Sequence, residues 1–361
     1  MSDPIGELLR ARSVVVLDGA LATELERRGA DLSDPLWSAK CLLERPELIR
    51  QVHLDYFRAG AQVATTATYQ ATFEGFARCG IERGRAARLM LEAVSLAREA
   101  RDEYRASLPS GSQPLLLIAA SVGPYGAMRA DGSEYRGRYG LTDRELAEFH
   151  RPRLEVLARS GADVLAFETL PCLQEALVLA ELLDEHPGMT AWLCFSCRDG
   201  TRNSEGEDIG SCAQALSQHR RVVAIGVNCT APEHVSQLLE RMRERAAKPL
   251  VAYPNSGERY DGHAKRWLGP AAHSSSAEAR QWVAAGARLI GGCCRTTPAD
   301  IRALSEAFGE PRDSARRGAP ASVIGEVRLA LLEERAHALD AVVGLEGHLL
   351  RAALGAQLLL Q

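Results

Sequence analysis

The sequence predicts an α/β protein that folds as a (β/α)8 barrel, or TIM barrel, followed by a C-terminal helical extension. Two observations support this prediction: eight short apolar segments alternate with long helical patterns, and one helix-to-strand junction recurs three times. The apolar segments are mostly continuous runs of Val, Ile, Leu and Ala, as expected of strands buried on both faces. A doubly wound parallel sheet is the alternative for this alternation.

The predicted strands lie at residues 14–17, 62–66, 115–120, 163–167, 190–195, 222–228, 249–253 and 288–291. Several helices between them have recognisable starts, namely a proline at the first helical position or a Thr-x-x-Glu capping box. These signals occur at Pro46 before a helix over residues 47–59, at Thr142 with Glu145, at Thr230 with Glu233, and at Pro298 after Thr297.

The recurring junction places a glycine between a helix and a strand. Gly60, Gly161 and Gly286 are each followed by an alanine and enter a strand within three residues. Glycine readily adopts the left-handed conformation that ends many helices, because it has no Cβ to clash with the backbone. The junction therefore indicates the αβ half of a repeated βα unit.

Composition excludes several classes of protein. Of the 361 residues, 46% are hydrophobic and 25% are charged, which is typical of a globular chain, and the net charge of −4 favours neither nucleic acid nor an anionic membrane. No apolar run reaches the roughly 18 residues of a membrane span. Asp3, Pro4 and Glu7 stand where a signal peptide would be basic or apolar. The nine scattered cysteines favour free thiols or metal ligands in a cytoplasmic protein.

The character of the chain changes near residue 310. We therefore predict a barrel domain over residues 1–310, a linker over residues 311–321 and a helical extension over residues 322–361. Apolar residues recur every seven positions in the extension, at Ile324, Leu331, Ala338, Leu345, Ala352 and Leu359. Two interpretations stay open: a frayed appendage, or a helix that binds a partner or forms a homo-oligomer.

In a barrel, functional side chains lie at the C-terminal ends of the strands. These ends carry Asp18, residues 65–68, Ser121, Glu168, Ser196, Cys229, Asn255, Cys293 and Cys294. The set is polar, acidic and rich in thiols, and it contains no run of basic residues for a phosphate.

The thiols give the strongest indication of function. Cys229 follows the sixth strand, and Cys293 and Cys294 follow the eighth, so that all three belong to one rim. Gly291 and Gly292 allow the backbone to bend before the cysteine pair. Three thiolates without a fourth protein ligand predict an open, catalytic type of zinc site. The alternative is that all three are small buried packing residues.

Two acids form the next indication. Asp18 and Glu168 each end an apolar strand, where a carboxylate is costly unless it has a partner. They are interpreted either as a structural ion pair or as a receptor for an ammonium group. Gly19 and Ala20 begin a helix over residues 21–28, whose free N–H groups could hold a carboxylate. Together these residues would hold an α-amino acid by both ends.

Other residues near the rim carry weaker signals. Cys194 and Cys197 are interpreted as packing residues, because an extended strand would point them to opposite faces. Trp37 and Tyr69 lie in or beside rim loops, where aromatic side chains either pack or line a pocket for a cation.

Several longer motifs extend this pattern. They are residues 17–25 (LDGALATEL), 35–40 (PLWSAK), 121–126 (SVGPYG), 226–229 (GVNC), 253–257 (YPNSG) and 291–298 (GGCCRTTP). On these motifs, the chain from about residue 14 to about residue 308 resembles the homocysteine S-methyltransferase family of zinc-dependent, thiol-methylating enzymes.

The resemblance implies a (β/α)8 barrel in which Cys229, Cys293 and Cys294 bind Zn²⁺ while Asp18 and Glu168 hold the amino group of L-homocysteine. With the rim assignments, the candidate substrate-binding residues are Asp18, Gly19, Ala20, Trp37, Tyr69, Glu168 and Asn255. The motifs are most similar to enzymes that use S-methylmethionine or S-adenosylmethionine. Betaine-using relatives carry Asp-Gly-Gly at the first motif, so betaine is a less favoured donor, and selenocysteine is the alternative acceptor.

The resemblance also implies a mechanism. Only a few per cent of an alkyl thiol with a pKa of about 8.5 is ionised at neutral pH. Homocysteine would join the zinc at its open position, lose its proton there and attack the sulfonium methyl, giving methionine. Two other classes stay open: a non-catalytic protein with a closed structural zinc, and a hydrolase with Ser121 as its nucleophile.

Overall fold

The computed structural model describes residues 3–30, 38–111, 113–261, 266–268 and 276–309, which belong to the compact unit Met1–Glu310. Eight parallel strands form the centre of this unit, and each lies within three residues of its predicted bounds. They are β1 (Val15–Val16), β2 (Val63–Thr65), β3 (Leu117–Val122), β4 (Val164–Leu170), β5 (Ala191–Phe195), β6 (Val222–Asn228), β7 (Leu250–Tyr253) and β10 (Ala287–Ile290).

The strands close on themselves. Their order is β1-β10-β7-β6-β5-β4-β3-β2, and Leu17, just after β1, pairs in parallel with Val63 of β2. The backbone N–H of Asp18 donates to the Val63 carbonyl at 3.0 Å, and that of Gln62 donates to the Val16 carbonyl at 2.7 Å. This closure confirms the (β/α)8 barrel and excludes the doubly wound sheet, which would keep two open edges.

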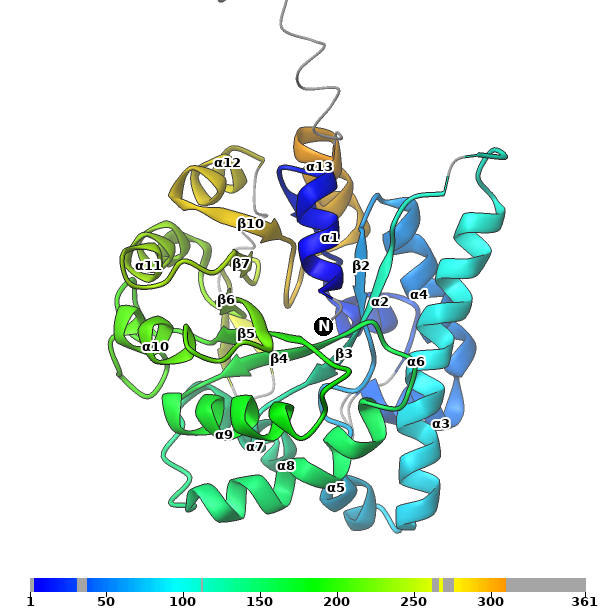
Figure 1. Cartoon of the computed structure of the whole chain (residues 1–361). Coiled ribbons are helices and arrows are strands. Elements are labelled where there is room, and N and C mark those ends of the chain that lie inside the picture. Colours follow the sequence, from blue (N-terminus) through cyan, green and yellow to red (C-terminus); the bar gives the residue numbers. More distant parts are fainter. Residues whose placement is uncertain (1–2, 31–37, 112, 262–265, 269–275, 310–361) are drawn as a thin grey trace, which may run out of the picture. The chain divides into compact units, whose positions relative to one another are not determined.

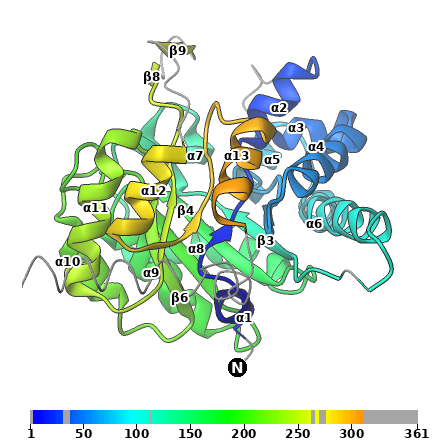
Figure 2. The same cartoon turned by 90° about the horizontal axis from the view of Figure 1, so that it is seen from above.

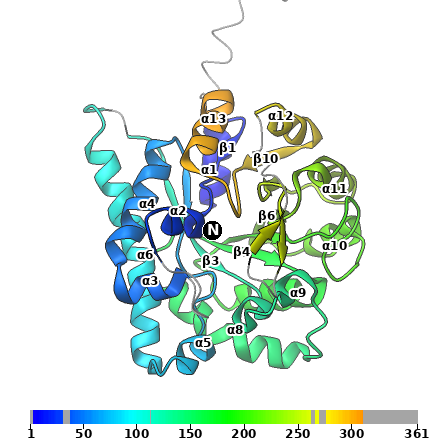
Figure 3. The same cartoon turned by 180° about the vertical axis from the view of Figure 1, so that it is seen from behind.

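One helix follows each strand and lies against the outside of the barrel (Figure 1). Figure 3 shows the same ring from behind. These helices are α4 (Pro46–Arg58), α6 (Arg83–Ala106), α8 (Asp143–Leu157), α9 (Leu173–Asp184), α10 (Ile209–Leu216), α11 (Pro232–Arg245), α12 (Ser276–Ala285) and α13 (Pro298–Phe308). Shorter helices occupy the strand-to-helix loops: α2 (Leu21–Arg27), α3 (Ser38–Glu44), α5 (Phe73–Arg78), α7 (Tyr125–Arg129) and the 3-10 helix Ser133–Tyr135.

The first helix, α1 (Pro4–Ala11), closes the N-terminal end of the barrel. Asp3 caps it by accepting the Gly6 N–H at 2.9 Å, and Pro4 is its first residue. Its apolar residues Ile5 and Leu8 are buried in the cluster of side chains inside the barrel. Figure 2 shows α1 at the end opposite β8 (Arg259–Asp261) and β9 (Arg266–Leu268). Because α1 closes this end, the C-terminal ends of the strands at the other end of the barrel are left to form the functional rim.

Most local predictions are confirmed. Gly60, Gly161 and Gly286 have positive φ values of 101°, 82° and 119°. The Thr142 capping box is present, as is Pro298 at the start of α13.

The predicted capping box at Thr230 is wrong. Ala231 is the N-cap of α11 and makes no side-chain cap. The hydroxyl of Thr230 instead donates to the Asn228 carbonyl and accepts the Cys197 N–H, both at 2.9 Å. The side chain therefore braces the rim turn after β6, and the helix starts one residue later.

The antiparallel pair of β8 and β9 was not predicted, because each strand has only three residues and neither forms an apolar run. Trp37, the linker and the helical extension lie outside the described residues. No helix in the described part of the chain combines the length and apolar character that a bilayer span requires.

Candidate metal centre and active site

The three predicted cysteines meet at the C-terminal rim of the barrel. The Sγ atoms of Cys229, Cys293 and Cys294 all lie within 4.8 Å of one another, and within the described residues they are the group of His, Cys, Asp or Glu side chains that could hold a metal ion. The Sγ atoms of Cys229 and Cys294 are 3.5 Å apart. All three are free thiols.

Backbone hydrogen bonds across β6, β7 and β10 fix this arrangement. The Cys229 N–H donates to the Tyr253 carbonyl at 3.2 Å, and the Cys293 N–H donates to the Pro254 carbonyl at 2.7 Å. The Cys294 carbonyl accepts the Ser256 N–H at 3.1 Å. The segment after β7 thus holds both cysteine segments, which is why residues distant in the sequence converge.

Turns at this rim are held in an uncommon backbone conformation. Thr169, Cys229 and Arg295 have φ values of 61°, 48° and 71°, although none is glycine. Such positions cost on the order of 1–3 kcal/mol and cluster at functional sites, where the surrounding contacts enforce them. Each stands beside a predicted site residue or is one, so the strain coincides with the predicted chemistry.

Hydrogen bonds among the three thiols shift their pKa values in opposite directions. Hydrogen bonds from Cys293, Cys294 and the Tyr135 hydroxyl lower the pKa of Cys229 well below its usual range. The Tyr135 hydroxyl lies 3.0 Å from the Cys229 Sγ. Donation to the charged Cys229 sulfur raises the pKa values of Cys293 and Cys294 in turn. One negative charge is therefore favoured here, and a cation would stabilise the further thiolates.

Asp18 lies beside this cluster and is buried. Its Oδ2 accepts the Thr65 N–H at 2.7 Å, and its Oδ1 accepts the Thr65 hydroxyl at 2.8 Å. Burial, with a smaller effect from the charge of Glu168, raises the pKa of Asp18 to about 8 against the effect of the Thr65 hydrogen bonds. No arginine or lysine in the described chain pairs with Asp18, so it is not half of a structural ion pair.

Glu168 is the second buried acid, at 8% exposure. Its Oε1 accepts the Ser121 hydroxyl, and its Oε2 accepts the Tyr253 hydroxyl at 3.0 Å. Burial raises its pKa to about 7 despite these hydrogen bonds. Because the Ser121 hydroxyl is donated to a carboxylate rather than to an imidazole, the arrangement does not favour Ser121 as a hydrolase nucleophile.

Asn228 links the segment of Glu168 to the three thiols. Its Oδ1 accepts the Thr169 N–H at 2.7 Å, and its Nδ2 donates to the Thr169 hydroxyl at 2.8 Å. The same Nδ2 lies 3.9 Å from the Cys293 Sγ. One buried amide thus contacts both the residue after Glu168 and the Cys293 thiol.

The remaining predicted residues have local partners. Tyr56 and Thr296 pack against Gly19, where an added Cβ would lie 2.9 Å from their atoms. The Ala20 N–H donates to the Thr296 hydroxyl at 3.2 Å. Asn255 accepts the Gly257 N–H at 2.9 Å through its side chain.

Two residues at the rim were missed by the sequence prediction. Glu134 and Tyr135 lie in the 3-10 helix after β3 and α7, and both interact electrostatically with Cys229. Neither follows a strand directly, so the search of strand ends did not reach them. Tyr69, which was predicted, interacts with the same group through Glu134 and Cys229.

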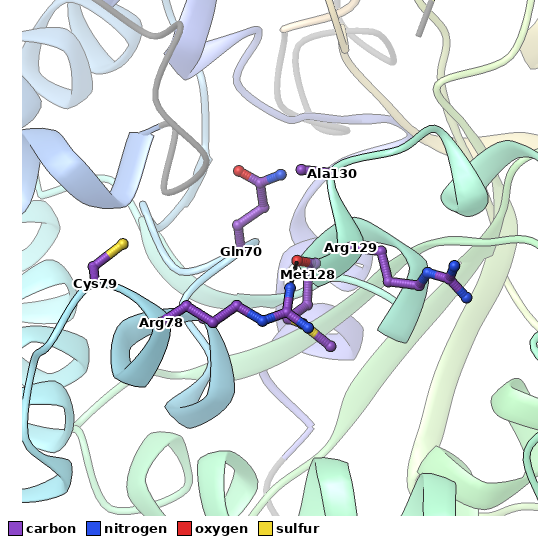
Figure 4. A pocket seen from close by; sticks show the side chains of 7 residues that line it. Gln70, Arg78, Cys79, Met128, Arg129 and Ala130 are labelled. Atoms are coloured by element: carbon purple, nitrogen blue, oxygen red, sulfur yellow. Dashed lines mark hydrogen bonds between the residues drawn. The ribbon is translucent and has the colours of Figure 1, made fainter. Parts of the chain in front are cut away.

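Two other features lie apart from the thiol group. Cys194 is fully buried inside the barrel and Cys197 is partly buried, as expected of packing residues. A small pocket lined by Gln70, Gly75, Arg78, Cys79 and residues 128–130 contains none of the predicted site residues (Figure 4). In it, Arg78 and Gln70 donate to backbone carbonyls of Met128 and Ala127, so these polar groups brace the loop.

Comparison with known proteins agrees with this geometry. A profile of the family described as homocysteine S-methyltransferase matches residues 15–308. Homocysteine S-methyltransferase YbgG of Bacillus subtilis is 53% identical over 306 residues, which cover 84% of this chain and 97% of the relative. Homocysteine S-methyltransferase of Escherichia coli is 50% identical over 305 residues, with 84% and 98% covered.

A solved structure has the same fold. The metallated form of the homocysteine methyltransferase MmuM from Escherichia coli superposes with a TM-score of 0.77 at 49% identity, covering 84% of this chain and 99% of that one. With the barrel, the rim thiols and this identity along nearly the whole length of its relatives, the chain belongs to the homocysteine S-methyltransferase family.

Proposed function

We propose that this protein transfers a methyl group from a sulfonium donor to the thiol of L-homocysteine, giving methionine, with S-methylmethionine preferred over S-adenosylmethionine. The observation that carries the proposal is the meeting of three thiols and two buried carboxylates at one rim. Family membership supports the reaction class and the acceptor. The donor preference rests on the sequence motifs.

Cys229, Cys293 and Cys294 would hold a Zn²⁺ ion. An all-sulfur set of ligands favours zinc over hard cations such as Mg²⁺. No fourth protein ligand joins the group in the described chain, which fits a catalytic site with an exchangeable position better than a closed structural one. Bound zinc would supply the lowered thiol pKa that makes a thiolate available near neutral pH.

Asp18 and Glu168 would hold the ammonium group of homocysteine. Both are buried, and each is destabilised in its charged form by burial. A cation placed between them would relieve this cost and their mutual repulsion. The hydrogen bonds from Thr65, Ser121 and Tyr253 hold the two carboxylates in place, so the acceptor would be oriented before transfer.

The need for reduced cysteines also indicates the cellular compartment of the protein. Three cysteines can bind zinc only while they stay reduced, and reducing conditions are those of the cytosol. We therefore propose a cytoplasmic enzyme with two small-molecule substrates.

The test is a methyl-transfer assay with homocysteine and four donors: S-methylmethionine, S-adenosylmethionine, betaine and methylfolate. We expect turnover with the two sulfoniums and the highest rate with S-methylmethionine. Betaine as the fastest donor would overturn the donor assignment, and faster methylation of selenocysteine would overturn the acceptor. A zinc-containing protein that binds no homocysteine would be a structural zinc protein instead.

A further inference from the structure

One carboxylate at the rim has no part in the reaction as described so far. The Oε2 atom of Glu134 is fully buried and has no hydrogen-bond partner among the described residues. Two arginines of the same segment bind another acid: Arg129 and Arg136 lie 3.2 Å and 3.7 Å from the Asp131 carboxylate. Glu134 thus has a buried carboxylate oxygen and no salt bridge to any residue that the structure describes.

Its position is next to the thiols. The Glu134 carbonyl accepts the Ser196 hydroxyl at 3.0 Å, which fixes the backbone to the rim. The hydroxyl of the next residue, Tyr135, lies 3.0 Å from the Cys229 Sγ. The charges of Glu134 and Cys229 raise the pKa of the Tyr69 hydroxyl, after burial, the main cause. Glu134, Tyr69 and Cys229 therefore lie close enough to influence one another's ionisation.

A nearby cation would stabilise the ionised carboxylate of Glu134. Burial, with smaller effects from the charges of Cys229 and Asp131, raises its pKa to about 7, against the opposing effects of a hydrogen bond to its own backbone and of the Arg136 charge. An ionised carboxylate in such surroundings is costly unless a positive group lies beside it. The charge of Arg136 offsets this shift only in part, because its guanidinium lies against Asp131. No described residue forms an ion pair with Glu134, so a bound molecule is the remaining source of a positive partner.

We propose that Glu134 is the counterion of the sulfonium group of the methyl donor, beside the aromatic ring of Tyr69. This inference rests on the proposed function. In transfer, the acceptor thiolate forms a bond to the methyl carbon, the bond from that carbon to the donor sulfur breaks, and the electron pair stays on the donor sulfur. The reacting atoms must approach to about 3–3.5 Å, so the sulfonium is the donor cation that lies nearest to the thiols.

The assignment separates the two substrates. Asp18 and Glu168 serve the acceptor, and Glu134 serves the donor. Because the sulfonium becomes a neutral thioether, Glu134 attracts the donor but not the demethylated product. Product release is then favoured by the same carboxylate that binds the substrate.

The experiment compares wild type, Glu134→Gln and Asp131→Asn as zinc-loaded proteins, by calorimetric titration in the absence of homocysteine. Asp131→Asn is the matched control, since it removes the same charge from the same loop at a carboxylate already bound by Ser133 and two arginines. The probes are S-methylmethionine and dimethylsulfoniopropionate, a sulfonium without an ammonium group. Homocysteine binding and circular dichroism are measured alongside.

We expect Glu134→Gln to weaken both sulfoniums about tenfold or more, with homocysteine affinity and zinc content kept, and Asp131→Asn to change none of them more than about twofold. Loss for S-methylmethionine alone would assign Glu134 to the ammonium and overturn the inference. Unchanged binding of both probes, or an equal loss for homocysteine, would overturn it too. Wild type that fails to methylate homocysteine with any sulfonium would instead contradict the proposed function.

Discussion

The Sγ atoms of Cys229 and Cys294 lie 3.5 Å apart although 65 positions separate the two residues in the sequence. Two parallel strands separated only by β7 bring them together. The turn after each strand holds a non-glycine residue at positive φ, namely Cys229 itself and Arg295. The barrel thus brings the two turns close together, and the backbone conformation within each turn directs the cysteine side chains toward one another.

Replacing Glu168 by Gln should weaken homocysteine binding. The amide keeps the size of the side chain and an oxygen for Ser121 and Tyr253, but it loses the charge that would attract the ammonium. A charge-assisted hydrogen bond contributes about 1.5–3 kcal/mol, so affinity measured by calorimetry should fall roughly 10- to 150-fold. Zinc content should survive, and normal homocysteine binding would reduce Glu168 to a structural role.

Binding of the amino-acid moiety should depend on pH. Glu168 and Asp18 have raised pKa values of about 7 and about 8, so both are mostly protonated and neutral at pH 6. Their attraction for an ammonium group therefore rises as pH rises from 6 to 8. Norleucine, which has no thiol, isolates this effect from zinc–sulfur chemistry. Its affinity should increase over this range in wild type and less steeply in Glu168→Gln, and a flat wild-type profile would count against the carboxylate receptor.

Asn228→Ala should destabilise the folded protein. The substitution leaves the buried Thr169 N–H without its acceptor and removes the amide that lies between β4 and β6. An unsatisfied buried group costs on the order of 1–3 kcal/mol. Urea denaturation should show this loss, and homocysteine affinity should fall because the turn after Glu168 is no longer fixed. Stability equal to wild type would mean that the amide is not needed there.

Removal of residues 322–361 should leave methyl transfer intact. The family match ends at residue 308, and every site residue precedes it. Turnover of the truncated protein should equal that of the full chain, while size-exclusion chromatography reports whether the oligomeric state changes. A folded but inactive truncated protein would show that the extension contributes to the site.

The fold was predictable because each signal is local and repeated. Continuous apolar runs located the eight strands, and glycines such as Gly60 and Gly286 located their starts. The thiols and acids followed, because strand ends in a barrel share a rim. Strands β8 and β9 have only three residues each and contain no apolar run, so the sequence carries no comparable signal for them.

The surroundings of the site were harder to predict. Thr230 has a capping-box spacing with Glu233, yet its hydroxyl binds the turn at Asn228 and Cys197. Glu134 and Tyr135 lie within a loop, and only the tertiary structure brings them to Cys229. Contacts of this kind depend on loop paths, which carry no periodic signal in the sequence.

The central claim is that Cys229, Cys293 and Cys294 hold the zinc on which methyl transfer depends. The most direct measurement is zinc content and turnover, determined together, in wild type, Cys294→Ser and the control Cys197→Ser. We predict one zinc per chain with activity in wild type and the control, and loss of both in Cys294→Ser. A fully active Cys294→Ser protein, or a zinc-free wild type with full turnover, would contradict the account.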